Sequence, residues 1–407
     1  MAGHAKHKWQ FTSRFRRNAF GWRSDVPIKR IKEALSEIKS IARKDSIIAA
    51  EGAVAFLEKI SPALERVDSS SGSIGTTVNN AIDTLVPIVV AANVDVKTRQ
   101  RWLERLWQAL QDDDMPYIEI LGDYWDRLCV TPELASRWAD ELKPTVEYIW
   151  NPNSPGHGYF KGTSVCLASL LAAGRNEELL ALIDKAPSRF WHHRQWGVKA
   201  LVAMGKRAEA IRYAEESRDL NSPGWLIALA CEDILLSSGL VEEAYRRYAI
   251  WANQNATNLN TFRVIAKKYP TIAPEQILRD LVASTPGQEG KWFATAKTIG
   301  LLDEAIHLAN TSPTEPKTLA RAARDFTQTQ PAFAFAAGMA SLHWIAHGYG
   351  YEITTLDVLD AFSATMQAAS HAGKDVQQVQ AQIQTLMEST PTGQQLLKTA
   401  LFRRLGN

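Results

Sequence analysis

The sequence predicts an all-α protein, an α-solenoid in which helical hairpins stack one after another. Three observations lead to this prediction. A short motif built around a glycine recurs at steps of 31 and 34 residues in the second half of the chain. Apolar residues recur at helical spacing through residues 25–150. The composition, 45% hydrophobic and 22% charged, is typical of a folded globular chain.

Residues 1–24 form a basic, aromatic arm. Residues 1–44 hold 12 of the 46 Lys and Arg residues but only 3 of the 44 acidic residues. Cations neutralise phosphates and aromatic rings stack on unpaired bases, a composition that suits RNA or single-stranded DNA. Alternatively, the rings dock on the helices while the cations stay solvated or pair with acidic residues, or the arm lies on a membrane surface. The residues expected to bind nucleic acid or a partner are Lys6, Lys8, Trp9, Arg14, Arg16, Arg17, Trp22 and Arg23.

Residues 25–150 are expected to form a first helical segment. Ser24 or Asp25 can cap its first helix, and Pro27 suits the first turn. Further helices are expected over 47–64, 76–91, 97–111, 116–129 and 132–150. These paired helices resemble the HEAT-like class of helical repeat, without a fixed period. The apolar face of the first helix comprises Ile28, Ile31, Leu35, Ile38 and Ile41.

Two polar stretches interrupt the helices. The acidic triplet at 112–114 is interpreted as a solvated loop, and residues 68–75 as a Ser/Gly-rich loop. The stretch NPNSPGHGYFKG at 151–162 is the clearest break in the chain. We therefore expect a boundary there, either a linker or a bend within one continuous solenoid.

The repeated motif lies between residues 159 and 313. Each copy has a glycine that can end one helix in the left-handed conformation. The fourth residue after it is acidic, where the positive end of the next helix dipole favours it, and the fifth is Leu or Ala. A degenerate copy follows Thr271. The four glycines and their acidic partners are Gly174 and Glu178, Gly205 and Glu209, Gly239 and Glu243, and Gly300 and Glu304.

Small residues recur eight positions before the first three glycines. Cys166, Gly197 and Cys231 occupy these positions, which indicates close helix packing rather than nucleophilic cysteines. Trp292 breaks the rule in the last copy. The three cysteines are odd in number and far apart, which argues against a disulfide framework and for a reducing compartment.

The stretches GKRAEAIRYAEES and GLVEEAYRRYAIWA resemble the second helix of a tetratricopeptide repeat. The resemblance covers about residues 160–313. It implies a right-handed superhelix whose concave face binds peptides or partner proteins, and it carries no catalytic residues. Residues 314–407 are expected to be helices that cap the array.

Candidate catalytic and metal motifs are incomplete. His343 and His347 share a helix face, but Trp344 stands where a zinc protease needs Glu. Lys291 is followed by Trp292, not by the Ser or Thr of a phosphate-binding loop. The tripeptide before and including His4 could hold Cu(II) or Ni(II). We therefore predict no enzyme activity, no cofactor and no metal.

The expected function is that of a non-catalytic scaffold that binds a partner protein or peptide on its helical-repeat surface. The alternative is nucleic-acid binding through the arm. The longest apolar run, residues 85–94, is half of what a membrane span needs, so no transmembrane segment is predicted. The arm lacks the apolar core of a secretory signal, and a cytoplasmic location is expected.

Overall fold

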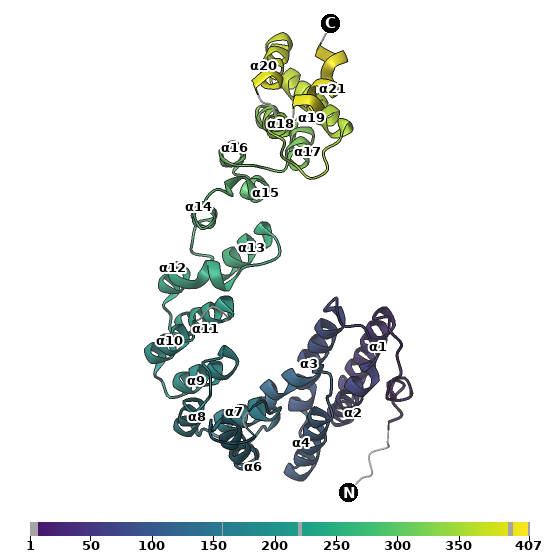
Figure 1. Ribbon diagram of the computed structural model, residues 1–407, viewed down its shortest axis with the longest axis vertical. Coiled ribbons are helices and arrows are strands. Elements are labelled where there is room, and N and C mark those ends of the chain that lie inside the picture. Colours follow the sequence, from purple (N-terminus) through teal and green to yellow (C-terminus); the bar gives the residue numbers. More distant parts are fainter. Residues whose placement is uncertain (1–6, 157, 219–221, 390–393, 406–407) are drawn as a thin grey trace. The chain divides into compact units, whose positions relative to one another are not determined.

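The computed structural model describes residues 7–156, 158–218, 222–389 and 394–405. These residues form helices joined by loops, and no β-strand occurs among them (Figure 1). The chain divides into two compact units, Met1–Pro223 and Gly224–Asn407.

The first unit consists of α-helices and two short 3₁₀ helices. Their bounds are η1 Phe11–Ser13, α1 Asp25–Ala42, α2 Ser46–Leu64, α3 Ser73–Ala91, α4 Val96–Gln111, η2 Glu119–Tyr124, α5 Trp125–Leu128, α6 Pro132–Trp150, α7 Thr163–Ala172, α8 Asn176–Ile183, α9 Trp191–Ala203 and α10 Arg207–Glu215.

The second unit continues the same architecture. Its elements are α11 Gly224–Ser237, α12 Val241–Ala252, α13 Asn258–Lys268, α14 Pro274–Ala283, η3 Glu289–Trp292, α15 Phe293–Thr298, α16 Leu302–Thr311, α17 Pro316–Phe326, α18 Pro331–Ala346, α19 Thr355–His371, α20 Val376–Ser389 and α21 Gln394–Leu405.

Consecutive helices pack in pairs within both units. In the first unit α9 packs against α10, and in the second α11 packs against α12 and α17 against α18 (Figure 1). Each pair also contacts its neighbours, as α7 does with α9 and α16 with α18. This arrangement confirms the predicted all-α fold of stacked helical hairpins.

The turns of the tetratricopeptide-like hairpins have the predicted geometry. All four repeat glycines have positive φ, between 72° and 87°. The acidic residue of each motif lies in the first turn of the following helix, which is α8, α10, α12 or α16. The residue after it is fully buried in every copy, and these four residues are Leu179, Ala210, Ala244 and Ala305.

The small residues inside the hairpins are packing positions, as predicted. Cys166, Gly197 and Cys231 are all buried. Burial raises the pKa of the Cys166 thiol to about 12, so at neutral pH it is protonated and a poor nucleophile. The copy with Trp292 departs from the others, because its first helix is replaced by η3 and the short α15.

The core of the first unit is centred on α2, which packs against α1, α3 and α4. Among the described helices, α3 alone is long and apolar enough to cross a membrane by length and composition. Its apolar side chains, Ile82 and Leu85 among them, are buried against neighbouring helices. These buried residues form part of the core of the first unit.

Arg99 of α4 closes the carboxyl end of α3. Its guanidinium donates from Nη1 to the Val89 carbonyl at 2.6 Å and from Nη2 to the Ala92 carbonyl at 2.7 Å. The last carbonyls of a helix lack partners inside that helix. Burial lowers the pKa of Arg99, and the carbonyls supply hydrogen bonds that water would otherwise give.

Three local expectations for residues 24–129 are met only in part. The Ser24 side chain makes no capping hydrogen bond to α1. The helix expected over 116–129 is mostly 3₁₀, as η2 followed by the four-residue α5. Asp112 and Asp114 are exposed, as expected for a solvated loop, but Asp113 is buried, and its carboxylate accepts hydrogen bonds from the amides of Tyr117 and Ile118.

The segment at 151–162 is attached to the helices before it. Lys161 Nζ donates to the carbonyl of Gln111 at 3.0 Å and to that of Asp113 at 2.7 Å. The Phe160 ring lies edge-on to Trp107. The two compact units divide after Pro223. The expected segment boundaries at 24, 150 and 313 stay predictions.

A buried carboxylate connects α11 with α12 and α13. Glu232 is fully buried and accepts hydrogen bonds from Asn253 Nδ2 at 2.7 Å, Lys268 Nζ at 2.5 Å and Tyr269 Oη at 2.5 Å. A buried charge is tolerated only when it is paired and hydrogen-bonded. Glu232 is therefore a structural residue of the second unit.

Candidate functional site

The arm is docked on the helices of the first unit from residue 7 onward. Phe11, Phe15 and Phe20 are buried, and the rings of Phe11 and Phe15 meet Phe56 of α2 edge-on at 5.5 and 5.0 Å between centroids. Such aromatic pairs add to the free energy of apolar burial. The docked arm corresponds to the second of the three sequence interpretations.

Two arginines of the arm pair with acidic residues of the helices or just after them. Arg14 Nη1 lies 2.7 Å from the Glu33 carboxylate of α1, and Arg17 Nη2 lies 3.0 Å from Glu65. The Gln10 amide donates to Glu37 at 2.9 Å. These contacts are partly exposed, so each contributes little to stability, but together they orient the arm.

The predicted binding residues have different environments. Lys6 lies outside the described residues. Trp9 is half-buried and Arg14 and Arg17 are paired, whereas the remaining predicted residues are exposed. The exposed ones are Lys8, Arg16, Trp22 and Arg23. That these residues bind nucleic acid or a partner stays a prediction.

Trp9 brings the arm to a groove. Its indole lies directly on Gly52 of α2, so close that a Cβ at Gly52 would collide with the ring. Beside it lies a cavity of about 790 Å³, which we call the α2–α4 groove. One wall belongs to the arm and α2, and the other to α4 and the residues before it. Its lining includes Trp9, Ile47, Ile48, Val94, Thr98 and Trp102.

A network of hydrogen bonds holds the walls of the groove. Arg105 of α4 donates to both oxygens of Glu58 at 2.7 and 2.6 Å and also pairs with Glu51. Trp102 Nε1 donates to the second Glu51 oxygen at 2.5 Å. The bonds to Glu58 and Glu51 raise the pKa of Arg105. Because both carboxylates belong to α2, the network fixes α4 against it.

Arg101 is a cation of the groove that forms no ion pair with the described residues. It lines the groove and is exposed, and it makes no hydrogen bond or ion pair with the described residues. Glu104, the acidic residue nearest to Arg101 in sequence, accepts a hydrogen bond from the Gln100 side chain at 3.0 Å. Asp95, which lines the groove, accepts from the Thr98 amide, and this bond lowers the pKa of Asp95. Within the described part of the chain, the groove thus combines an apolar surface with one positive charge that has no acidic partner, an arrangement suited to a ligand that carries both apolar groups and an anion.

Sequence reasoning identified Trp9 but not the rest of this groove. Glu51 and Trp102 are separated by 51 residues, and nothing in the local pattern states that they meet. Gly52, in the middle of an apolar helix, is the one signal that could have indicated a close approach at this position.

The described residues contain no group of three or more His, Cys, Asp or Glu side chains that could hold a metal ion. His343 and His347 lie with their ring centroids 4.1 Å apart, and burial lowers the pKa of His343. His4 lies outside the described residues.

Comparison with known proteins adds little to this description. No known protein family model matches the chain, and no curated protein matches it in sequence. Among solved structures, the chain is similar to one in "Crystal structure of APC/C hetero-tetramer Cut9-Hcn1", with 12% identity over 92% of this chain and 75% of that chain. The TM-score is 0.26. A score of this size supports no conclusion about function, and the fold assignment therefore depends on the helices themselves.

Proposed function

We propose that this protein is a non-catalytic interaction scaffold that binds a peptide segment of a partner protein in the α2–α4 groove. The observation that supports this is the groove itself, whose lining includes the half-buried Trp9 and an exposed arginine, Arg101, that has no partner among the described residues. Aromatic and arginine side chains are the residue types most often responsible for binding energy at protein interfaces.

The shape of the groove favours a peptide over a compact ligand. On α4 its lining extends from Thr98 to Arg105, a length of about 10 Å at 1.5 Å per residue. On α2 it extends from Ile47 to Ala55. Apolar grooves accept amphipathic helices, which lay their apolar face into the groove. We therefore expect a segment that combines apolar side chains with an acidic residue.

A displayed library of random 12-residue peptides, selected on the full-length protein, tests this proposal. Peptides with apolar and acidic residues should be enriched. Arg101→Glu should weaken the binding of the selected peptides by tenfold or more, since the substitution replaces an attraction by a repulsion. Arg66→Glu is the matched control, because Arg66 is exposed in the same unit and does not line the groove. Equal binding to both variants, or no enrichment, would contradict the proposal.

No specific observation favours the nucleic-acid alternative. The rings of Phe11, Phe15 and Phe20 lie in the core and are not available for stacking on bases. Nucleic-acid binding can be measured directly with a labelled 20-nucleotide single strand over a series of salt concentrations. If the arm binds nucleic acid, changing Lys8, Arg16 and Arg23 together to Gln should weaken binding and reduce its salt dependence.

A further inference from the structure

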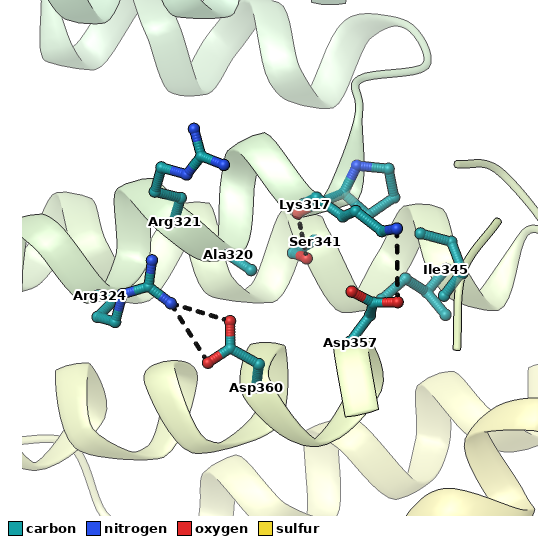
Figure 2. A pocket seen from close by; sticks show the side chains of 10 residues that line it. Lys317, Ala320, Arg321, Arg324, Ser341, Ile345, Asp357 and Asp360 are labelled. Carbon is teal, nitrogen blue, oxygen red and sulfur yellow. Dashed lines mark hydrogen bonds and ion pairs between the residues drawn. The ribbon is translucent and has the colours of Figure 1, made fainter. Parts of the chain in front are cut away.

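The second unit contains a small charged pocket between α17, α18 and α19 (Figure 2). We propose that it is a binding site for a glutamate side chain of an acidic peptide, with Arg321 as the residue that contacts the carboxylate. This site is independent of the proposed α2–α4 groove, because every residue that lines it belongs to the second unit.

Three cations lie on one face of α17. Lys317, Arg321 and Arg324 are spaced four and three residues apart, so their side chains leave the helix on the same side. Two of them are matched by acidic residues of α19. Lys317 Nζ lies 3.6 Å from Asp357, and Arg324 Nη1 lies 3.1 Å from Asp360.

Arg321 is the cation left over. It is exposed, and it makes no hydrogen bond or ion pair with the described residues. Figure 2 shows its guanidinium at the edge of the pocket, turned away from both Asp357 and Asp360. Because these aspartates are engaged by Lys317 and Arg324, the charge of Arg321 remains available to a ligand.

The pocket has the size and wall of a site for one short acidic side chain. Its volume is about 190 Å³. Ala320, Ile345 and Ile353 give it an apolar wall, against which the methylene groups of a glutamate can pack. Ser341 Oγ lies in its floor but donates to the Pro316 carbonyl at 2.9 Å. The guanidinium of Arg321 is therefore the donor that a carboxylate would meet, and Arg suits a carboxylate because two N–H groups can bind it together.

Apolar residues near the pocket can contact the rest of the peptide. Tyr351 and Leu356 are each 76% exposed, in the loop before α19 and in its first turn. The loop is held to α17 by Lys317 Nζ, which donates to the Glu352 carbonyl at 3.1 Å. A peptide with an apolar residue beside its glutamate would use both features.

The acidic residues of the site favour a peptide over nucleic acid. A phosphodiester backbone carries one charge per nucleotide and would meet Asp357 and Asp360 as it passed. A single carboxylate can approach Arg321 without contacting either aspartate. In addition, a single unpaired cation attracts a polyanion only weakly.

Fluorescence anisotropy with a labelled octapeptide of alternating Glu and Leu tests the proposal on the full chain. The peptide should bind, and its analogue with Gln in place of Glu should bind at least tenfold more weakly. Arg321→Gln should lower the affinity about fivefold and Arg321→Glu about tenfold or more. Arg263→Glu is the matched control, because Arg263 is an exposed arginine of the same unit that does not line the pocket.

Three outcomes would overturn the proposal. One is that the peptide does not bind, or binds equally well to Arg321→Glu. Another is that Arg263→Glu weakens binding as much, which would indicate general attraction of anions. The third is that Arg321→Glu weakens the binding of an oligothymidylate of equal charge but leaves the binding of the peptide unchanged. Arg101→Glu separates the two proposals: loss of the peptide in that variant alone would assign binding to the α2–α4 groove and reject the site at Arg321.

Discussion

Gly52 decides whether the arm can reach the groove. In most helices a glycine weakens the element, because it has more conformational freedom to lose than alanine. At this position in α2 the absence of a side chain leaves room for the Trp9 indole. A single residue of the helix therefore determines the position of a residue 43 positions away in the chain.

We expect Gly52→Ala to displace Trp9 and destabilise the first unit by about 1–3 kcal/mol, the usual range for overpacking a core. Urea denaturation measures the loss. The control is the same substitution in a Trp9→Ala background, where there is no ring to displace and the better helix propensity of alanine should make Gly52→Ala neutral or stabilising. An equal loss in both backgrounds would show that Gly52 does not act through Trp9.

The helical hairpin is the element that the chain repeats, and its turn depends on one backbone conformation. At Gly205, between α9 and α10, φ is 77°. L-residues avoid this region, because Cβ comes too close to the following carbonyl oxygen. This turn also sets which side of the next helix each residue faces. The acidic residue in the first turn of that helix and the buried Leu or Ala after it therefore depend on the turn.

Gly205→Ala should lower the free energy of unfolding by about 1–2 kcal/mol, and Gly205→Asn by less, because asparagine tolerates the left-handed region. Thermal or urea denaturation measures the stability of the unaltered protein and of the two variants, which should fall in the order unaltered, Gly205→Asn, Gly205→Ala. Gly21→Ala serves as the control, because a Cβ at Gly21 would meet no atom within 4 Å and its φ lies outside the positive region. Equal effects of Ala at both positions would argue against the role of the turn.

At the scale of the whole molecule, the arm is part of the core of one unit. Phe11, Phe15 and Phe20 belong to the same apolar cluster as the helices of the first unit. The carboxyl-terminal helices α17 to α21 form a cluster of their own in the second unit. Loss of the arm should therefore affect one unit and not the other.

Deletion of residues 1–24 should lower the stability of the first unit by several kcal/mol, because burial of each phenylalanine contributes about 1.5–3 kcal/mol. Hydrogen exchange followed by mass spectrometry should show faster exchange in α1 and α2 and unchanged exchange in α18 and α19. Changing the exposed Lys8, Arg16 and Arg23 to Gln together should leave exchange unchanged. If the deletion does not alter α1 and α2, the docked arm contributes nothing to the fold.

The sequence by itself determined the hairpins. A left-handed glycine, an acid in the next first turn and a buried small residue all act within about ten residues of one another, so they can be read directly from the printed chain. Local chemistry also begins α19, where Thr354 forms a capping box with Asp357, three residues further on.

The tertiary structure alone decided where the arm docks, which acids pair with its cations and where a ligand could bind. The aromatic and basic composition of the arm is compatible with stacking on bases and with packing on helices, because both bury rings and neutralise charge. Only the burial of Phe11, Phe15 and Phe20 distinguishes packing on the helices from stacking on bases. Likewise, Arg101 and Arg321 differ from Arg66 and Arg263, which are also exposed arginines, in that each lines a pocket. Such contacts depend on residues far apart in the chain, and local sequence patterns carry no information about them.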